Sequence, residues 1–111
     1  MRATNHSEAL RLAILLIHAL REPARRIAAH DRQLASQLRR AASGIALQLA
    51  EGSASTDGNA RRHHSYAHGS AKETRVCIEV AAAWGYLSDK TAAELDSIAD
   101  RVCALTHGLR R

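Results

Sequence analysis

Apolar residues recur along this chain at steps of three and four, the spacing that places them on one face of an α-helix. The clearest stretch runs from Asp31 to Gly52, and its single stripe consists of Leu34, Leu38, Ala41, Ile45 and Leu49. Asp31 has the side chain of a helix N-cap, and Gly52 suits a left-handed C-cap. Gly44 lies inside this helix at a cost of about 1 kcal/mol relative to Ala, which predicts close approach of another helix.

A first helix is expected to begin near Ser7, which suits an N-cap, and to continue to Pro23, which ends or kinks it. Residues 24–29 fit either a connection or a continuation after the kink. The inward stripe is expected to consist of Leu10, Ile14, Ile17 and Leu20, widened by Leu12 and Leu16.

A third helix is expected over about residues 58–86, and a fourth after Ser88 or Asp89. The fourth carries the stripe Leu95, Ile98, Val102, Leu105 and Leu109. Short connections make sequence neighbours antiparallel. The chain is therefore predicted to be all-α, an antiparallel up-down four-helix bundle in a single domain over residues 1–111.

The stretch 76–84 is apolar nearly all round, and a small bundle cannot bury every side of such a helix. A second subunit is expected to cover it, so the predicted oligomer interface consists of Val76, Ile78, Val80 and Trp84.

The net charge of +5 and the pI near 10.0 favour an anionic partner such as RNA, DNA or an acidic protein. If the second and third helices are adjacent, one basic surface is predicted from Arg32, Arg39, Arg40, Arg61, Arg62 and Lys72. Only Tyr66 is near for base stacking, so phosphate contacts would dominate. The alternative is a set of solvated arginines partly paired with carboxylates.

The histidines His63, His64 and His68 have a spacing that can hold a divalent metal ion, although a solvated helix face is the favoured interpretation. A small metal-dependent hydrolase using His64, His68, Glu51 or Glu73 is an alternative that requires these groups to converge. No nucleophile motif or phosphate loop accompanies them, so no enzyme activity, metal or cofactor is predicted.

Glu51 lies in the last turn of its helix, where the helix dipole disfavours a negative charge, and Glu73 lies mid-helix beside small residues. Both positions predict a buried pair with arginine, within or between subunits. Cys77 and Cys103 lack a redox spacing and are expected to be buried free thiols. The longest apolar run is too short for a bilayer, and a cytoplasmic location is expected.

Two separated motifs resemble those of the four-helix bundle protein family, also called the intervening-sequence protein family after members encoded within large-subunit ribosomal RNA genes. The first is Gln37 to Ile45 with Leu49 to Gly52, and the second is Ala67 to Glu73 with Ala81 to Leu87. The resemblance places motif residues at Gln37, Arg39, Arg40, Glu51, Gly52, Gly69, Ser70 and Glu73.

The resemblance implies a bacterial cytoplasmic protein that assembles as a homopentamer. A related branch contains the accessory proteins of diversity-generating retroelements, which bind a reverse transcriptase. The leading functional hypothesis is therefore a non-enzymatic basic oligomer that binds nucleic acid or a nucleic-acid enzyme such as a reverse transcriptase. A purely structural assembly protein is the alternative.

Overall fold

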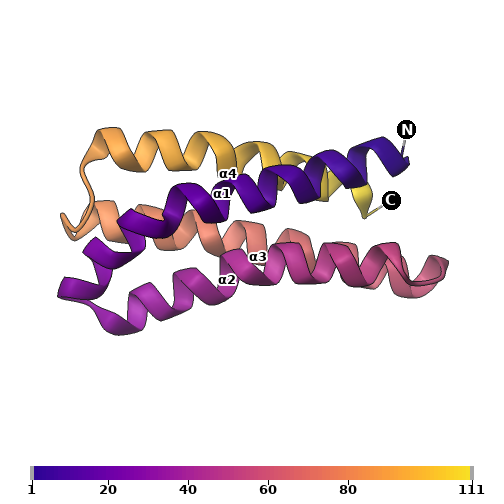
Figure 1. Cartoon of the computed structure of the whole chain (residues 1–111), viewed down its shortest axis with the longest axis horizontal. Helices are drawn as coiled ribbons and strands as arrows, with labels where there is room; N and C mark the ends of the chain where they lie inside the picture. The colour runs from indigo at the N-terminus through magenta and orange to yellow at the C-terminus, as the bar shows by residue number, and fades with distance from the viewer. Residues whose placement is uncertain (1, 111) are drawn as a thin grey trace.

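Four antiparallel helices form an elongated bundle in a computed structural model, which describes the backbone of residues 2–110 and the side chains of residues 5–56 and 58–110. The helices are α1 (Arg2–His30), α2 (Arg32–Ser53), α3 (Asp57–Ala83) and α4 (Asp89–Leu109). The bundle measures 42 × 22 × 19 Å, and each helix runs opposite to the next (Figure 1). The predicted all-α, up-down four-helix bundle is confirmed.

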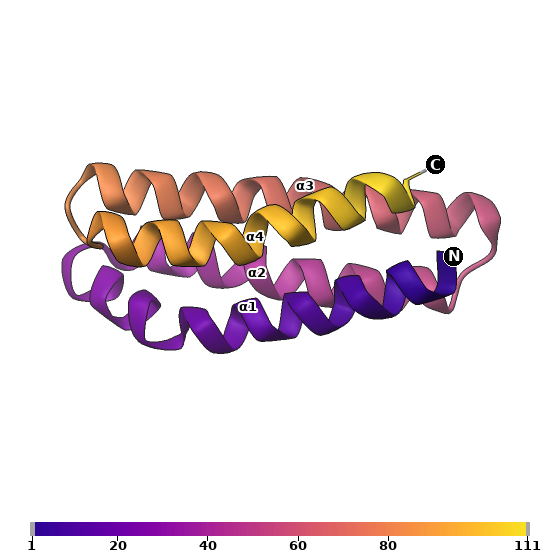
Figure 2. The same ribbon diagram turned by 90° about the horizontal axis from the view of Figure 1, so that it is seen from above.

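The two ends of the bundle differ in what they carry. The α1–α2 and α3–α4 connections share one end, while both chain termini and the α2–α3 connection lie at the other (Figures 1 and 2). Each helix packs against its two neighbours, so α2 contacts α1 and α3, and α4 contacts α3 and α1. In the part of the chain that the structure describes, no helix combines the length and hydropathy needed to cross a membrane.

The predicted helix starts hold for α2 and α4. The Asp31 carboxylate accepts a hydrogen bond from the Leu34 backbone N–H at 2.9 Å, and the Ser88 hydroxyl accepts one from Thr91 at 3.1 Å. The expectation for α1 is wrong, because the helix already begins at Arg2 and Ser7 lies inside it. Pro23 also lies within α1, which continues to His30, since a proline removes one backbone hydrogen bond without forcing an end to a helix packed on two neighbours.

The left-handed C-cap is at Gly85 rather than at Gly52. Gly52 remains in the α2 helix and is buried, whereas Gly85 has φ 83° after the last residue of α3. The N–H of Tyr86 donates to the carbonyl of Ala81, and that of Gly85 to the carbonyl of Ala82, each at 2.9 Å. This pair of bonds is a Schellman motif, which fixes the backbone around Trp84 and Tyr86.

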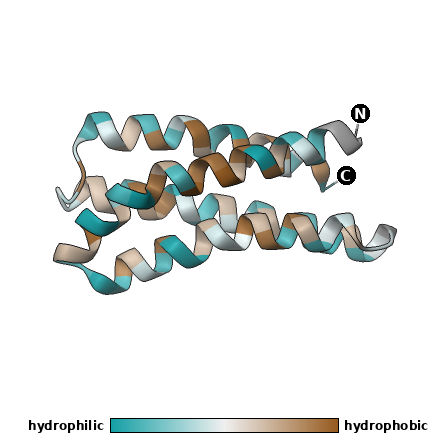
Figure 3. Cartoon of the chain, in the orientation of Figure 1, coloured by the Kyte–Doolittle hydropathy of each residue, from teal (hydrophilic) through white to brown (hydrophobic). Residues whose placement is uncertain are grey.

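The core combines one large aliphatic layer with many alanines. The predicted inward side of α1 is confirmed except at one position, because Ile14 is 44% exposed. Leu12, Leu16 and Leu20 are buried, and Leu10 and Ile17 pack against the core. Figure 3 shows the middle of α1 as strongly hydrophobic even on its outer side. The fully buried side chains of α2 and α3 are mostly leucine, isoleucine and alanine, among them Leu38, Ile45, Leu49, Ala67, Ala71 and Ile78.

Two glycines of α2 lie directly against α3. A Cβ atom built on Gly44 would lie 3.0 Å from Ser70 Oγ, which confirms the predicted close approach. A Cβ atom on Gly52 would lie 2.8 Å from Nε2 of His64, whose ring is buried and hydrogen-bonded to the Leu109 carbonyl. The absence of a side chain at these two positions therefore sets the spacing of α2 and α3.

Replacing Gly52 by Ala is expected to destabilise the bundle by about 1–3 kcal/mol, because the added Cβ atom would lie 2.8 Å from Nε2 of the buried His64 ring, and the ring or the helix must then shift. The matched control is Gly69→Ala on α3, where a Cβ atom meets nothing within 4 Å. That variant is expected to be stabilised by up to about 1 kcal/mol through helix propensity alone. Urea unfolding of both variants measures the difference, and equal stabilisation by the two alanines would contradict the close-contact account.

Candidate nucleic-acid interface

Arginines from α1 and α2 meet in a groove between these two helices. The groove has a volume of about 240 Å³ and is lined by Ile17, Leu20, Arg21, Ala24, Leu38, Arg39, Ala42 and Ser43. Its two cationic members, Arg21 and Arg39, are both exposed, and neither forms an ion pair with any described residue. We call this feature the arginine groove. Unpaired guanidinium groups beside an apolar floor suit a phosphate that needs a bidentate donor.

The charges of the bundle are divided between its helices. Within their helical ranges, α1 and α2 carry eight arginines against three glutamates, whereas α4 carries two basic and four acidic residues. The arginine groove therefore lies in the basic half of the molecule. Such a separation produces a field that attracts polyanions to one side.

The six predicted basic residues are all exposed, but they do not form one surface. The helices α2 and α3 are adjacent as expected. However, Arg39 lines the groove with α1, and Lys72 lines a different groove with α4. The prediction of a single α2–α3 surface is therefore wrong, because consecutive helix positions point about 100° apart and side chains on one helix serve both of its neighbours.

The remaining four predicted basic residues lie at different levels of the bundle. Arg32 is the first residue of α2, at the end that carries the α1–α2 connection. Arg61 and Arg62 lie in the first turns of α3, at the opposite end, and Arg40 follows Arg39 on α2. The sequence analysis did not include Arg21. This residue lies on α1, and only the packing of α1 against α2 places it in the same groove as Arg39.

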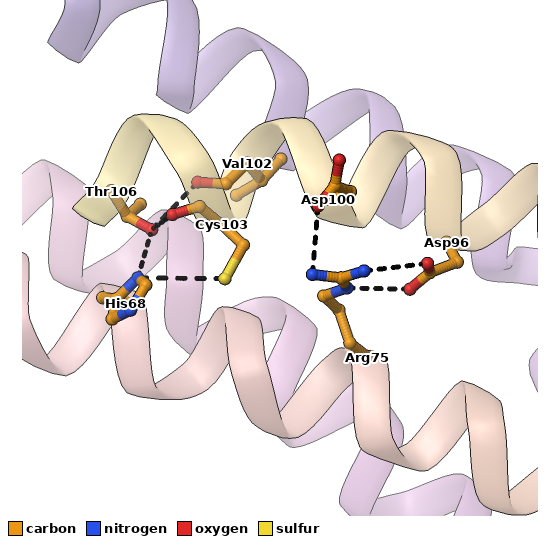
Figure 4. Close-up of polar contacts among 7 residues, drawn as sticks. All are labelled: His68, Arg75, Asp96, Asp100, Val102, Cys103 and Thr106. Atoms are coloured by element: carbon orange, nitrogen blue, oxygen red, sulfur yellow. Dashed lines mark hydrogen bonds and ion pairs between the residues drawn. The ribbon is translucent and has the colours of Figure 1, made fainter. Parts of the chain in front are cut away.

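The groove between α3 and α4 has a different character. It has a volume of about 520 Å³ and is lined by Lys72, Arg75, Val76, Ile78, Glu79, Ala82, Ala92, Ala93 and Asp96. Arg75 donates two hydrogen bonds to the Asp96 carboxylate, at 2.8 and 3.0 Å, and contacts Asp100 at 3.1 Å (Figure 4). This groove is mixed in charge. Its arginine is neutralised by Asp96 and Asp100, and Lys72 is its one lining cation without an ion pair among the described residues.

The sequence predicted pairing between arginine and the carboxylates of Glu51 and Glu73. The structure has such a pair at other residues, Arg75 and Asp96. Its hydrogen bonds lower the pKa of Asp96, and the same bonds raise the pKa of Arg75. Glu51 is exposed, and its Oε2 lies 3.6 Å from Nδ1 of His63. Glu73 is exposed and forms no ion pair among the described residues. The predicted burial of these two glutamates with arginine is therefore wrong within one subunit.

The three neighbouring histidines of α3 point to three different partners. Nδ1 of His63 lies 2.7 Å from Oε1 of Gln48, and Nδ1 of His64 lies 3.1 Å from the Leu109 carbonyl. Nδ1 of His68 lies 3.2 Å from the Thr106 hydroxyl and 3.9 Å from the Cys103 sulfur (Figure 4). Among the described residues, no three His, Cys, Asp or Glu side chains lie close enough to hold a metal ion. The convergence required by the hydrolase alternative is absent there.

The other motif residues of α2 and α3 have structural positions. Ser70 faces Gly44 across the α2–α3 contact, and Gly52 faces His64. Gln37 and Gly69 are exposed. Of the two cysteines, Cys77 is buried and Cys103 is half-buried, and both are free thiols; burial raises the pKa of Cys77.

The predicted oligomer interface is divided by the fold. Val76 and Trp84 are 56% and 68% exposed, which leaves them open to a partner. Val80 is half-buried against the core, and Ile78 is only 1% exposed, inside the core. Ile78 therefore does not belong to an outer surface, because it lies on the side of α3 that faces the bundle interior.

His68 predicts a loss of stability in mild acid. Its burial, followed by the charge of Arg110, lowers the pKa of the folded imidazole below the unfolded value of about 6.5. At a pH between these two pKa values the unfolded chain binds more protons than the folded chain. The free energy of unfolding therefore falls as the pH decreases from the unfolded pKa to the folded pKa.

Thermal unfolding from about pH 7.5 to about pH 5.5 is expected to show a smaller fall of Tm in His68→Asn than in the unaltered protein. The matched control is His18→Asn, a change at an exposed position of α1 that is expected to leave the pH dependence as it is. An identical pH dependence of the unaltered protein and His68→Asn would rule out this role of His68.

Comparison with known proteins agrees with the arrangement of helices and with both sequence motifs. The sequence profile of the family described as 23S rRNA-intervening sequence protein matches residues 6–108. The fold is similar to the crystal structure of a protein of unknown function from the S23 ribosomal protein family of Bacteroides thetaiotaomicron. The TM-score is 0.88 at 10% sequence identity, and the match covers 100% of this chain and 98% of that chain.

At this level of identity the structural likeness shows the fold alone. A search of curated proteins finds no match. The profile match spans nearly the whole sequence, and the motifs that carried the resemblance, from Gln37 to Gly52 and from Ala67 to Leu87, lie within it. The chain therefore belongs to the 23S rRNA-intervening sequence protein family.

Proposed function

We propose that this protein binds nucleic acid through phosphate contacts made by the basic half of the bundle, α1 and α2. The observation that carries the proposal is the arginine groove, in which Arg21 and Arg39 lie on neighbouring helices without a carboxylate partner among the described residues. Arginines that stabilised the fold would be paired, as Arg75 is with Asp96. Unpaired arginines gathered on one side instead favour an external anion.

The proposed contacts extend beyond the groove along the same two helices. Arg32 and Arg40 are exposed and form no ion pair among the described residues. By contrast, Arg25 is engaged by Glu22 at 2.7 Å, and Arg26 lines a groove between α1 and α4 with Glu94. The acidic helix α4 lies on the other side of the bundle from α2. A polyanion is therefore favoured along α1 and α2 and repelled by α4.

The double variant Arg21→Gln/Arg39→Gln is expected to weaken binding of a single-stranded oligonucleotide and to reduce its salt dependence. Loss of two phosphate contacts lowers the slope of log K against log salt by about 1.4. The matched control, Lys90→Gln/Arg101→Gln, removes two positive charges from α4 and is expected to leave this slope unchanged. Fluorescence anisotropy over a salt series measures both.

Two results would contradict the proposal. One is the absence of binding by the unaltered protein at about 50 mM salt, where such contacts are strongest. The other is an equal loss of slope in the two double variants, which would mean that net charge acts without a defined surface.

Self-association is a second proposal, and the exposed aliphatic residues favour it. Val76 is 56% exposed at the edge of the α3–α4 groove, and Leu47 on α2 is 64% exposed. One chain also carries a basic side, α1 and α2, and an acidic helix, α4. The basic side of one copy can therefore face the acidic helix of the next copy, as in the head-to-tail contacts that build rings. The family resemblance implies five subunits.

The variant Val76→Asp is expected to shift the protein towards the monomer, because a buried unpaired carboxylate at a subunit contact is costly. Val76→Thr has nearly the same shape without a charge and serves as the control, with most of the assembly retained. Light scattering coupled to size-exclusion chromatography measures the mass. A monomeric unaltered protein at micromolar concentration would end this proposal.

A further inference from the structure

The rings of His30, Tyr86 and Trp84 form a stack. These residues lie beside the α1–α2 and α3–α4 connections, which share one end of the bundle (Figures 1 and 2). The rings of His30 and Tyr86 lie 5.0 Å apart between centroids with planes only 2° apart, and those of Trp84 and Tyr86 lie 6.4 Å apart at 17°. We call this set, His30, Tyr86 and Trp84, the ring stack. Tyr86 is the shared ring and is half-buried, whereas Trp84 is 68% exposed.

The backbone holds the ring stack rigidly. Trp84 and Tyr86 flank Gly85, whose left-handed conformation and two hydrogen bonds back to Ala81 and Ala82 close the Schellman motif. His30 is the last residue of α1, and Asp31 immediately after it caps α2. The backbone on both sides of Gly85 is therefore ordered before any ligand arrives, which lowers the conformational entropy lost when the indole of Trp84 binds one.

We propose that the ring stack is a platform for an unpaired base of a single-stranded nucleic acid, with the open face of Trp84 as the stacking surface. The inference rests on the proposed phosphate contacts and specifies which form of nucleic acid they serve. Parallel rings extended by one exposed face are the arrangement on which bases stack, whereas a duplex end or groove would not place a single base there.

Charge and distance connect this platform to the arginine groove. His30 is nine residues beyond Arg21 along α1, a rise of about 14 Å. Arg32 lies two residues after His30 and is exposed, without an ion pair among the described residues. A strand whose phosphates follow the arginines of α1 and α2 can therefore deliver a base to Trp84.

The emission of the single tryptophan, Trp84, tests the inference directly. The probe is a single-stranded oligo(dT) of about twelve nucleotides, and its counterpart is an abasic oligonucleotide with the same phosphates. Oligo(dT) is expected to quench Trp84 fluorescence and the abasic strand is not, although both bind at about 50 mM salt. Oligo(dT) is expected to bind about tenfold more tightly than the abasic strand.

The variant Trp84→Leu is expected to bind oligo(dT) and the abasic strand equally, and Trp84→Phe to restore part of the preference. If both strands bind the unaltered protein equally and without quenching, the platform is refuted while the phosphate proposal stands. If neither strand binds, both proposals fail. If Trp84 emission changes only with protein concentration and Trp84→Leu alters the mass of the assembly, the ring is a contact between copies and the platform is refuted.

Discussion

The close contact between α2 and α3 is the constraint on which the rest of this bundle depends. Gly44 and Gly52 present bare backbone to Ser70 and His64, and the nearby core positions are largely alanine. A Cβ atom at Gly52 would overlap the buried His64 ring, and one at Gly44 would crowd the Ser70 hydroxyl, so a side chain at either position requires these groups or the helices to shift. The register of α2 against α3, and hence the direction of every other side chain on these helices, follows from this contact.

The same register explains how a chain of modest net charge has a strongly basic side. With α2 fixed on α3, Arg39 turns towards α1 and meets Arg21, while Arg75 turns towards α4 and is neutralised by Asp96. The excess of arginine over carboxylate therefore lies on α1 and α2, and the carboxylates of α4 either pair with Arg75 or face solvent. The Gly85 turn completes the arrangement, because it holds Trp84 and Tyr86 at the end where α1 meets α2.

Periodicity and capping predicted the helices well, but not how each helix is rotated. Asp31 and Ser88 were predictable as N-caps because a single side chain decides them. On α1 only Ile14 was wrongly expected to face inward, because leucine and isoleucine occur on nearly all sides of this helix and the pattern did not separate Ile14 from Leu16. A glycine at position 52 is suited both to a C-cap and to a close helix contact. Only the position of His64 on α3 shows that the second role applies.

The candidate site was predictable in its residue types and not in its location. The sequence indicated exposed arginines on α2, and this is correct, but their partners depend on rotations about the helix axes that composition does not encode. Arg21 and the ring stack were missed for the same reason, since residues from separate helices define each of them. Tyr66 was the one ring noted near the predicted arginines, and little base stacking was expected. Trp84 was assigned to a subunit contact, and its stacking with Tyr86 could not be read from the sequence.

The central claim is that one side of the bundle, α1 and α2, together with the end at Trp84, receives a nucleic-acid strand. Backbone amide NMR of the protein during addition of a single-stranded oligonucleotide tests this claim most directly. The account predicts shifts around Arg21, Arg39 and residues 84–86, with α4 little changed. Shifts concentrated on α4, or spread evenly over all four helices, would contradict it.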